Sequence, residues 1–437
     1  MARLLIIFLC TGFCQLKIAA SAQSWSLEKC LNYAREHNPE LQVSRSKLSG
    51  AAIDHKSATA RLIPKIVGNG ALDHYWKIPV QVFPGQLVGQ PEGTFVPVRL
   101  GTPWMGNIGL EADLNLIDVE AWKQIRLAAL DQQLLESDGK SAVNQVVRNV
   151  HMAYLSAQLG ALDIAGASEQ YSLYEQGHRL LRLQFEKGLT DKISLNQSEI
   201  ILRNLKTNIV KTQTDFACAL LDLKFWMGYP MEDSIGIDQS FNEVLMTQKL
   251  ENFNEERLPD HQTYLLRTEI HRRQYALARA VWYPKVSLRS GYSRLGFGQN
   301  LDFIGSSKWF SSGFVGLKVA VPILDLEKMV YEPKRQKGLI RTADLEHEQF
   351  LQQQKQIWLR GQKLMSQALR TISEQEQNLL LSSENELLSR KKLEKGIINF
   401  IELRQLQEEL SLARRQLTDA KREYLKHYLT LHYLQNN

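Results

Sequence analysis

The residue types that most often carry chemistry are spread along this chain without the spacing that a catalytic or metal-binding site requires. Its ten histidines form no HExxH motif and lie at no metal-ligand spacing from a cysteine. No nucleophile motif occurs, and the serines and aspartates are scattered over stretches with a helical pattern. The sequence therefore predicts no enzyme, no cofactor and no metal site.

The charge and the cysteine content argue against two further classes of protein. The formal net charge of +6 is mild for 437 residues and is evenly spread, which is not typical of a nucleic-acid-binding surface. Cys30 and Cys218 lie on stretches that we interpret as separate helices, so we expect buried thiols and not a disulfide. A disulfide-stabilised scaffold is not expected either.

The first 22 residues have the pattern of a secretory signal peptide. Arg3 gives a positive start, ten apolar residues follow in "LLIIFLCTGF", and Ala-Ser-Ala at 20–22 forms a small-residue cleavage site. The apolar run is too short to cross a bilayer, and Cys10 and Cys14 lack the small-residue surroundings of a lipid-attachment site. We expect residues 1–22 to be removed and the chain to be exported.

Two stretches of alternating apolar and polar residues are the clearest candidates for contact with lipid. In "NIGLEADLNL" (107–116) and "VGLKVAVPI" (315–323) every second residue is apolar, which gives a strand one apolar face. The candidate lipid-facing positions are Ile108, Leu110, Leu114, Val315, Leu317, Val319 and Val321. A strand over a soluble core shows the same alternation, but these runs approach the about 9–11 residues of a membrane-crossing strand. Aromatic residues also cluster near the predicted strand ends.

Four strands of this kind are predicted, at about 65–76, 107–117, 285–295 and 313–324. Four strands cannot close a membrane barrel, because the smallest barrels use about eight. An open sheet would leave backbone groups unpaired in lipid. Three chains would together supply about twelve strands, so the pattern predicts a homotrimer that shares one barrel and contacts membrane lipid.

The chain repeats its own pattern. "FEKGLTDKISL" (185–195) returns as "LEKGIINFIEL" (393–403), and "IGLEADLNLIDVE" (108–120) returns as "VGLKVAVPILDLE" (315–327). The offset is 207–208 residues for these pairs but 220 for motifs ahead of the strands, so the first copy carries 13 extra residues. They fall between 73 and 106, in a stretch that we assign to a loop. The sequence therefore predicts an internal duplication.

The duplication predicts the domain organisation. Residues 23–228 form the first repeat, 229–257 a linker or equatorial segment, and 258–437 the second repeat. Each repeat is expected to contain a helix, two strands and a long helical hairpin.

Two stretches, at about 119–185 and 326–392, are long enough for a coiled-coil column. They contain almost no proline and little glycine, and at 1.5 Å per residue each would reach roughly 100 Å. After Leu403 apolar residues recur at spacings of three and four as far as Leu434, with His427 as the one interruption. We predict an α+β membrane protein with a long α-helical coiled-coil barrel. Its four β-strands per chain contribute to a trimeric 12-stranded β-barrel.

In the order and spacing of its motifs, the chain resembles the TolC family of outer-membrane efflux channel proteins. The motifs are the opening "SLEKCLNYAREHNPEL", the strand ends "LNLID" and "PILDL", the two Lys-Gly turns, and "FWMGYP" at the close of the first half. The resemblance covers essentially all of the chain after residue 22. It implies a trimer in the bacterial outer membrane with a helical tunnel through the periplasm, to whose middle 229–257 would add a belt.

The resemblance also implies a function and partners. The chain would be the passive channel-tunnel of a tripartite efflux or type I secretion system. A periplasmic adaptor (membrane fusion) protein and an inner-membrane transporter would deliver the substrate, which the sequence leaves open among drugs, metals and secreted proteins. The alternative is an exported coiled-coil adaptor or scaffold. An adaptor would need compact β-domains on both sides of one hairpin, whereas this chain has two hairpins in tandem.

Site residues follow from the same resemblance. The turns that dock the adaptor would be Lys187, Gly188, Leu189, Lys395, Gly396 and Ile397. A ring of carboxylates that narrows the tunnel near its tip falls, in this sequence, on Glu402 and Gln405, so that one of the two acidic positions is neutral. The first repeat has Ser194 at the position of Glu402.

Overall fold

The computed structural model describes residues 24–238, 252–305, 309–395, 397–398 and 400–435. The predicted signal peptide, the middle of the linker and Gly396 therefore lie outside the described residues. The chain divides into two compact units. Unit 1 comprises residues 1–45, 138–262 and 349–437, and unit 2 comprises 46–137 and 263–348.

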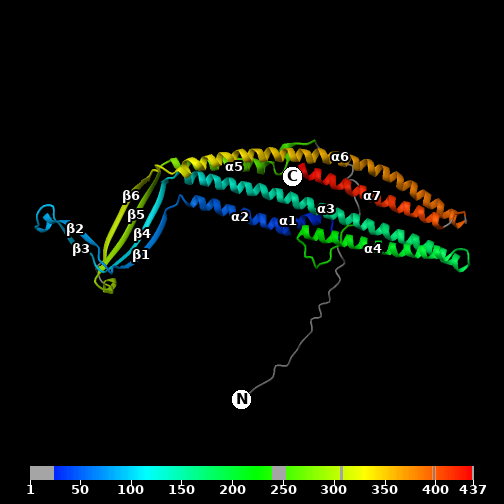
Figure 1. Ribbon diagram of the computed structural model, residues 1–437, viewed down its shortest axis with the longest axis horizontal. Coiled ribbons are helices and arrows are strands. Elements are labelled where there is room, and N and C mark those ends of the chain that lie inside the picture. The colour runs from blue at the N-terminus through cyan, green and yellow to red at the C-terminus, as the bar shows by residue number, and fades with distance from the viewer. Residues whose placement is uncertain (1–23, 239–251, 306–308, 396, 399, 436–437) are drawn as a thin grey trace, which may run out of the picture. The chain divides into compact units, whose positions relative to one another are not determined.

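Unit 2 contains a four-stranded antiparallel sheet. Its strands are β1 (Lys65–His74), β4 (Trp104–Ile117), β5 (Lys285–Gly298) and β6 (Trp309–Ala320), in the order β1-β4-β5-β6 (Figure 1). All four lie close to the predicted positions. β6 ends at Ala320, however, so the prediction that Val321 occupies a strand is wrong. The following Pro322 has no N–H to continue the ladder.

The strand register divides the sheet into two chemically different faces, because residues paired across an antiparallel ladder share a face. The apolar sheet face carries Ile66, Leu72, Ile108, Leu110, Ala112, Leu114, Val286, Leu288, Tyr292, Val315, Leu317 and Val319. The polar sheet face carries charged and polar side chains together with some apolar ones: Lys65, Val67, Asn69, Asp73, Met105, Asn107, Glu111, Asp113, Ser287, Arg289, Ser293, Leu295, Phe297, Phe310, Ser312, Phe314 and Lys318. The predicted strand positions other than Val321 thus lie on one face.

The segment between β1 and β4 is more ordered than the predicted loop. It contains β2 (Val80–Pro84), a 3-10 turn at Gly85–Val88 and β3 (Phe95–Arg99), with β2 and β3 paired as an antiparallel hairpin. β-branched and aromatic residues recur at every second position of both short strands, which favours strand over loop. The extra length of the first copy therefore includes secondary structure of its own.

Helices precede and follow the sheet strands. α1 (Leu27–His37) and α2 (Pro39–Ala60) come before β1, and α5 (His261–Ala278) comes before β5. The "NPEL" motif begins α2, because the Asn38 Oδ1 atom accepts from the N–H groups of Glu40 and Leu41 at 2.9 and 3.3 Å. Pro39 occupies the first helical position, where its missing N–H costs nothing.

Four long helices form two hairpins among the described residues. α3 (Val119–Glu186) is followed by α4 (Lys192–Met227), and α6 (Glu332–Glu394) is followed by α7 (Phe400–Gln435) (Figure 1). A π-helical turn at Glu327–Tyr331 leads into α6. With 68 residues, α3 is roughly 100 Å long at 1.5 Å per residue. Among the described helices, none combines the length and the apolar character needed to cross a membrane.

Two clusters of buried side chains hold unit 1 together. One joins α1, α3 and α4 through residues that include Cys30, Val150 and Leu223. The other joins α3 to α6 and α7, with Leu159 and Tyr428 among its members. On α7 the second cluster follows the predicted heptad spacing at Leu417, Ala420 and Tyr424, and then shifts by one position to Tyr428.

The two described cysteines are free thiols in different surroundings. Cys30 is buried, and burial raises the pKa of its thiol to about 12. Cys218 is exposed on α4, so the prediction that it is buried is wrong. Its position on the heptad pattern faces away from the two buried clusters of unit 1.

Buried His151 predicts a pH-dependent stability. Its Nδ1 lies 2.9 Å from the Tyr433 hydroxyl, its Nε2 has no partner, and burial together with nearby His432 lowers its pKa from 6.5 to about 4. Protonation therefore favours the unfolded chain. The stability from neutral His151 is complete above about pH 6.5 and is lost as pH falls toward 4, by up to about 3 kcal/mol.

Denaturant unfolding between pH 7 and 4 measures this effect. His151→Gln, which cannot titrate, should lose less stability over that range than the unmodified protein. His55→Gln, on α2, should behave like the unmodified protein. Equal pH profiles for the unmodified protein and His151→Gln would show that His151 does not control this loss.

Candidate functional site

The first Lys-Gly motif lies in the turn between α3 and α4, as predicted. Gly188 has a φ of 71°, in the left-handed region that favours glycine. The Gly188 N–H donates to the Phe185 carbonyl at 2.9 Å and the Leu189 N–H to the Gln184 carbonyl at 2.8 Å. This pair of bonds is a Schellman motif, which ends a helix and reverses the chain.

The start of α4 completes this turn. The Asp191 carboxylate accepts from the Ser194 N–H at 2.8 Å, and this hydrogen bond lowers the pKa of Asp191. Leu189, between the two helix ends, is 74 % exposed. Lys187 is also exposed. The turn thus presents an apolar residue beside a cation.

The turn between α6 and α7 repeats one of these bonds. The Ile397 N–H donates to the Lys392 carbonyl at 2.9 Å, the equivalent of the bond from Leu189. Ile397 is 66 % exposed, and Lys395 is exposed. The turn of each hairpin therefore carries an exposed aliphatic residue directly after a Lys-Gly pair.

The two predicted gate positions lie at the start of α7. Glu402 is in the first turn of the helix, and Gln405 follows three residues later, so the two share one side of α7. Both side chains are exposed in the single chain. A ring of these side chains would require further chains, so the gate stays a prediction.

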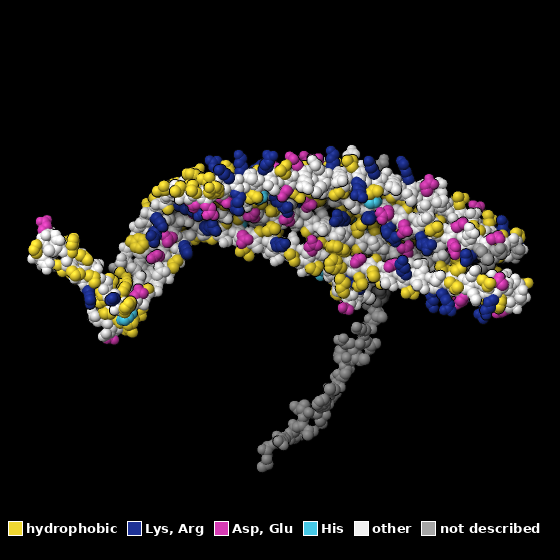
Figure 2. Space-filling view, in the orientation of Figure 1, with side chains coloured by type: hydrophobic (Ala, Val, Ile, Leu, Met, Phe, Trp, Pro, Cys, Tyr) yellow, Lys and Arg dark blue, Asp and Glu magenta, His cyan; other side chains and the backbone are white. Residues whose placement is uncertain are grey.

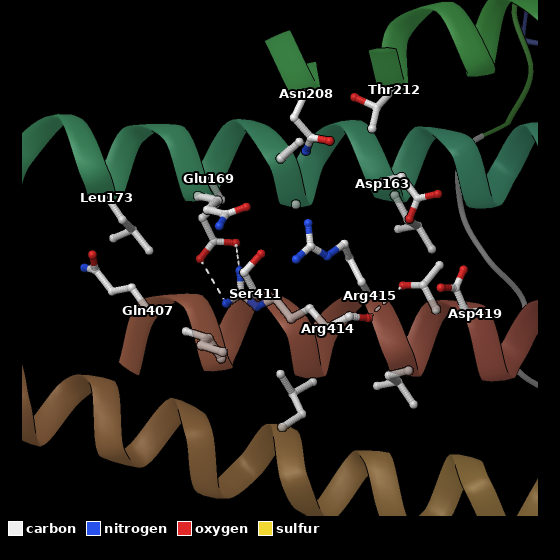
Figure 3. A pocket seen from close by; sticks show the side chains of 18 of the residues that line it. Asp163, Glu169, Leu173, Asn208, Thr212, Gln407, Ser411, Arg414, Arg415 and Asp419 are labelled. Carbon is white, nitrogen blue, oxygen red and sulfur yellow. Dashed lines mark hydrogen bonds and ion pairs between the residues drawn. The ribbon is translucent and has the colours of Figure 1, made fainter. Parts of the chain in front are cut away.

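A charged cavity between α3, α4 and α7 was missed by sequence reasoning. It has a volume of about 420 Å³ (Figure 3). Arg414 on α7 contacts both carboxylate oxygens of Glu169 on α3, at 2.7 and 3.1 Å. Arg422 reaches Asp163 at 2.8 Å, while burial raises the pKa of that carboxyl. These pairs hold α3 against α7, and nothing in their geometry resembles a catalytic arrangement.

The sheet provides the second functional surface. On the polar sheet face Arg289 pairs with Asp113 at 3.1 Å, and Lys285 pairs with Glu120 at 2.6 Å. On the apolar sheet face Val315 is 75 % and Leu317 68 % exposed. A sheet of this kind can separate an apolar phase from an aqueous one.

Exposed hydrophobic side chains continue past the end of β6. Figure 2 shows such side chains gathered where β6 gives way to α6. They include Val321, Ile323, Leu324 and Leu326, of which Ile323 is 89 % exposed. Among the described residues, no group of three or more His, Cys, Asp or Glu side chains could hold a metal ion.

Known proteins match this chain both in sequence and in structure. No family model matches the chain. The "Cation efflux system protein CusC" of Escherichia coli O157:H7 is 23% identical over 309 residues, which cover 68% of this chain and 60% of that protein. The same protein of strain K12 gives the same identity and covers 61% of its length. The matched part of the chain thus spans about 60% of the length of these curated relatives.

Solved structures match over nearly the whole chain. A crystal structure of CusC aligns with a TM-score of 0.77 and 17% identity over 94% of this chain and 92% of that one. The Campylobacter jejuni CmeC outer membrane channel gives 0.75, with 15% identity over 93% and 85% of the two chains. The open state of the Neisseria gonorrhoeae MtrE outer membrane channel gives 0.73, with 15% identity over 94% and 88%. The arrangement of long helices and a four-stranded antiparallel sheet is shared.

Proposed function

The chain belongs to the TolC family of outer-membrane efflux channel proteins, and we propose that it is the outer-membrane channel of a tripartite efflux system. It would be a passive exit duct without catalytic activity. The observation that carries the proposal is the match to CusC over 94% of the chain. The alternative, a periplasmic adaptor or scaffold, gains no support from these relatives. Deletion of the channel should lower the rate of efflux, and complementation should restore it. The amount of the inner-membrane transporter should stay the same in both strains.

The proposed assembly is a homotrimer with a 12-stranded barrel in the outer membrane. Each chain supplies four strands, and among the described strands β1 and β6 each pair along one edge only. Unpaired edges in lipid are costly, so closure against neighbouring chains is favoured. In this arrangement the apolar sheet face contacts lipid and the polar sheet face lines the lumen.

The proposed repeats keep their predicted limits, 23–228 and 258–437, joined by 229–257. Their support is the same series of elements in each half, in which a helix, two long strands and a helical hairpin follow one another. The β2–β3 hairpin accounts for the longer first half. The two hairpins would carry the tunnel through the periplasm, and a trimer would present about six turns at its tip.

These turns are proposed to dock a periplasmic adaptor, which links the channel to an inner-membrane transporter. The support is the exposed Leu189 and Ile397, each beside a lysine. We expect the double variant Leu189→Asp and Ile397→Asp to weaken adaptor binding at least about tenfold, because apolar anchors dominate such contacts. Co-purification of the adaptor with the trimer measures the effect.

The control is Val43→Asp on α2, which replaces an exposed apolar residue outside both turns. It should leave adaptor binding unchanged. Undiminished binding by the double variant, in a protein that remains trimeric, would show that the turns do not dock the adaptor.

Glu402 is proposed as part of the periplasmic gate, with neutral Gln405 beside it. Three copies of an exposed acid at the narrow end of a tunnel would favour cations and hold divalent ions. Single-channel recording on Glu402→Gln should show several-fold weaker block by divalent cations and lower cation selectivity. Glu376→Gln, at an exposed position of α6, is the control. Unchanged selectivity and block in Glu402→Gln would remove Glu402 from the gate.

Cations are one proposed substrate class, since the curated relatives are named for cation efflux. The test is growth of a strain that lacks the channel on a panel of transition-metal cations and on organic drugs. Sensitivity confined to the cations supports this class, whereas sensitivity confined to the drugs would contradict it.

A further inference from the structure

One charged residue interrupts the apolar sheet face. The register of β5 places Arg294 opposite Ile108 on β4 and Ser311 on β6, so that all three share this face. Among the described residues of the four sheet strands, Arg294 is the only Lys, Arg, Asp or Glu on this face. Its side chain is exposed. All other charged residues of these strands lie on the polar sheet face.

Arg294 lies at the boundary of the apolar band. The strand residues from Val286 to Arg294 number nine, and a tilted strand crosses a bilayer in about 9–11 residues. Beyond Arg294, toward the loops that join β1 to β4 and β5 to β6, the same face carries Trp309 and Trp104. Tryptophan is enriched at the level of the lipid headgroups. The assignment of Arg294 to the level of the lipid headgroups rests on the proposed function, in which the apolar sheet face contacts lipid.

The surroundings of Arg294 supply hydroxyl donors and open space. The Tyr292 hydroxyl donates to the Ser311 Oγ atom at 3.1 Å, and Ser311 is the cross-strand neighbour of Arg294. On the same face, the next strand pairs Gly70 with Ile108, and a side chain at Gly70 would meet nothing within 4 Å. The guanidinium group therefore has neighbouring donors and room, without an acid on its own face.

An arginine on an apolar face, without an acid on the same face, is stabilised by binding an anion. The planar guanidinium group matches phosphate oxygens in a bidentate manner, and a cation on a lipid-facing strand is tolerated near the headgroups and not at mid-bilayer. A free phosphate bound to Arg294 would lie beside apolar side chains and would have nothing to hold it there. A lipid phosphate is held at this level by its acyl chains. The charge of Arg294 and its depth in the membrane together favour a lipid phosphate over a free phosphate.

We propose that Arg294, with the hydroxyl groups of Ser311 and Tyr292, binds the phosphate group of a membrane lipid at the outer edge of the apolar sheet face. The lipid lies with its acyl chains along Ile108 and Leu110, which are 63 % and 59 % exposed. Three such sites would surround the trimer. Each would bind lipid where β5 meets its neighbouring strands.

Native mass spectrometry of the detergent-extracted full chain tests the proposal, with phosphatidic acid as the probe. Diacylglycerol, which lacks the phosphate, is the headgroup control. We expect phosphatidic acid to bind at least about tenfold more tightly than diacylglycerol, and Arg294→Gln to remove this preference. Arg294→Lys should retain part of it. Lys318→Gln, which removes one positive charge from the polar sheet face, should retain all of it.

Equal binding of the two lipids by the unmodified protein would overturn the proposal, as would an undiminished preference in Arg294→Gln. Displacement of phosphatidic acid by millimolar inorganic phosphate would assign the site to free phosphate instead, and would also contradict the proposal. A polarity-sensitive fluorophore on Leu317→Cys, in a protein whose exposed Cys218 is replaced by serine, separates this failure from failure of the proposed function. A label in lipid without a phosphate preference rejects only the Arg294 site, whereas a label in water rejects the lipid-facing assignment itself.

Discussion

Replacing Val315 with arginine is expected to abolish assembly of the channel in the membrane. Val315 is 75 % exposed on the apolar sheet face, and its paired residue on β5 is Ser290, midway between Val286 and Arg294. A charge at mid-bilayer depth costs about 2–4 kcal/mol per chain on a lipid-facing strand, and a trimer incurs this cost three times. The yield of trimer from outer-membrane extracts, measured on a non-denaturing gel, should fall to near zero.

The matched control is Ser312→Arg, which introduces the same residue on the polar sheet face of the same strand. In the proposed barrel its side chain would enter the lumen, where water surrounds it. This variant should assemble normally. If both arginine variants give normal trimer, the two faces have not been assigned correctly.

A second large effect is expected at Gly228, which ends α4. Its φ is 69°, and an added Cβ atom would lie 2.5 Å from the His37 carbonyl oxygen. Alanine there adds about 1–2 kcal/mol of backbone strain to about 1–3 kcal/mol of overpacking against a backbone that cannot move aside. The free energy of unfolding of Gly228→Ala should fall by about 2–5 kcal/mol, as measured by denaturant unfolding.

Gly188→Ala separates the two contributions. Gly188 has nearly the same φ, 71°, but an added Cβ atom would meet nothing within 4 Å. Only the strain of about 1–2 kcal/mol should remain. If Gly228→Ala is no more destabilising than Gly188→Ala, the contact between the end of α4 and His37 does not restrict this position.

The fold was largely predictable because its signals are long and regular. The alternation in β4 and β6 and the heptad spacing in α7 extend over many residues, so local exceptions do not hide them. The first Lys-Gly turn was also predicted correctly, because a left-handed glycine acts through its own backbone. The gate, docking and lipid-facing roles stay predictions, since they depend on neighbouring chains.

The misses have local physical causes. Strand pairing extended to Trp309 at one end of β6, while Pro322 prevented its extension at the other, and the alternation alone does not mark either limit. The β2–β3 hairpin was not predicted, because its segment has no counterpart in the second copy with which it could be compared. The pairs Arg414–Glu169 and Arg422–Asp163 join residues about 250 positions apart, and no helical periodicity identifies which acid faces which base.

In the proposed trimer, three chains close one barrel through the edges of β1 and β6. Its most direct measurement is disulfide cross-linking between cysteines placed along β1, from Ile66 to Leu72, and one cysteine at Val315 on β6. Each protein carries one introduced pair in a background in which the exposed Cys218 is replaced by serine, is oxidised in intact outer membranes, and is separated on a non-reducing gel. We predict products of two and three chains for the β1 positions that lie nearest Val315 and share its face, and none at the positions between them. Monomer alone at every position, from protein that is present in the membrane, would contradict a shared barrel.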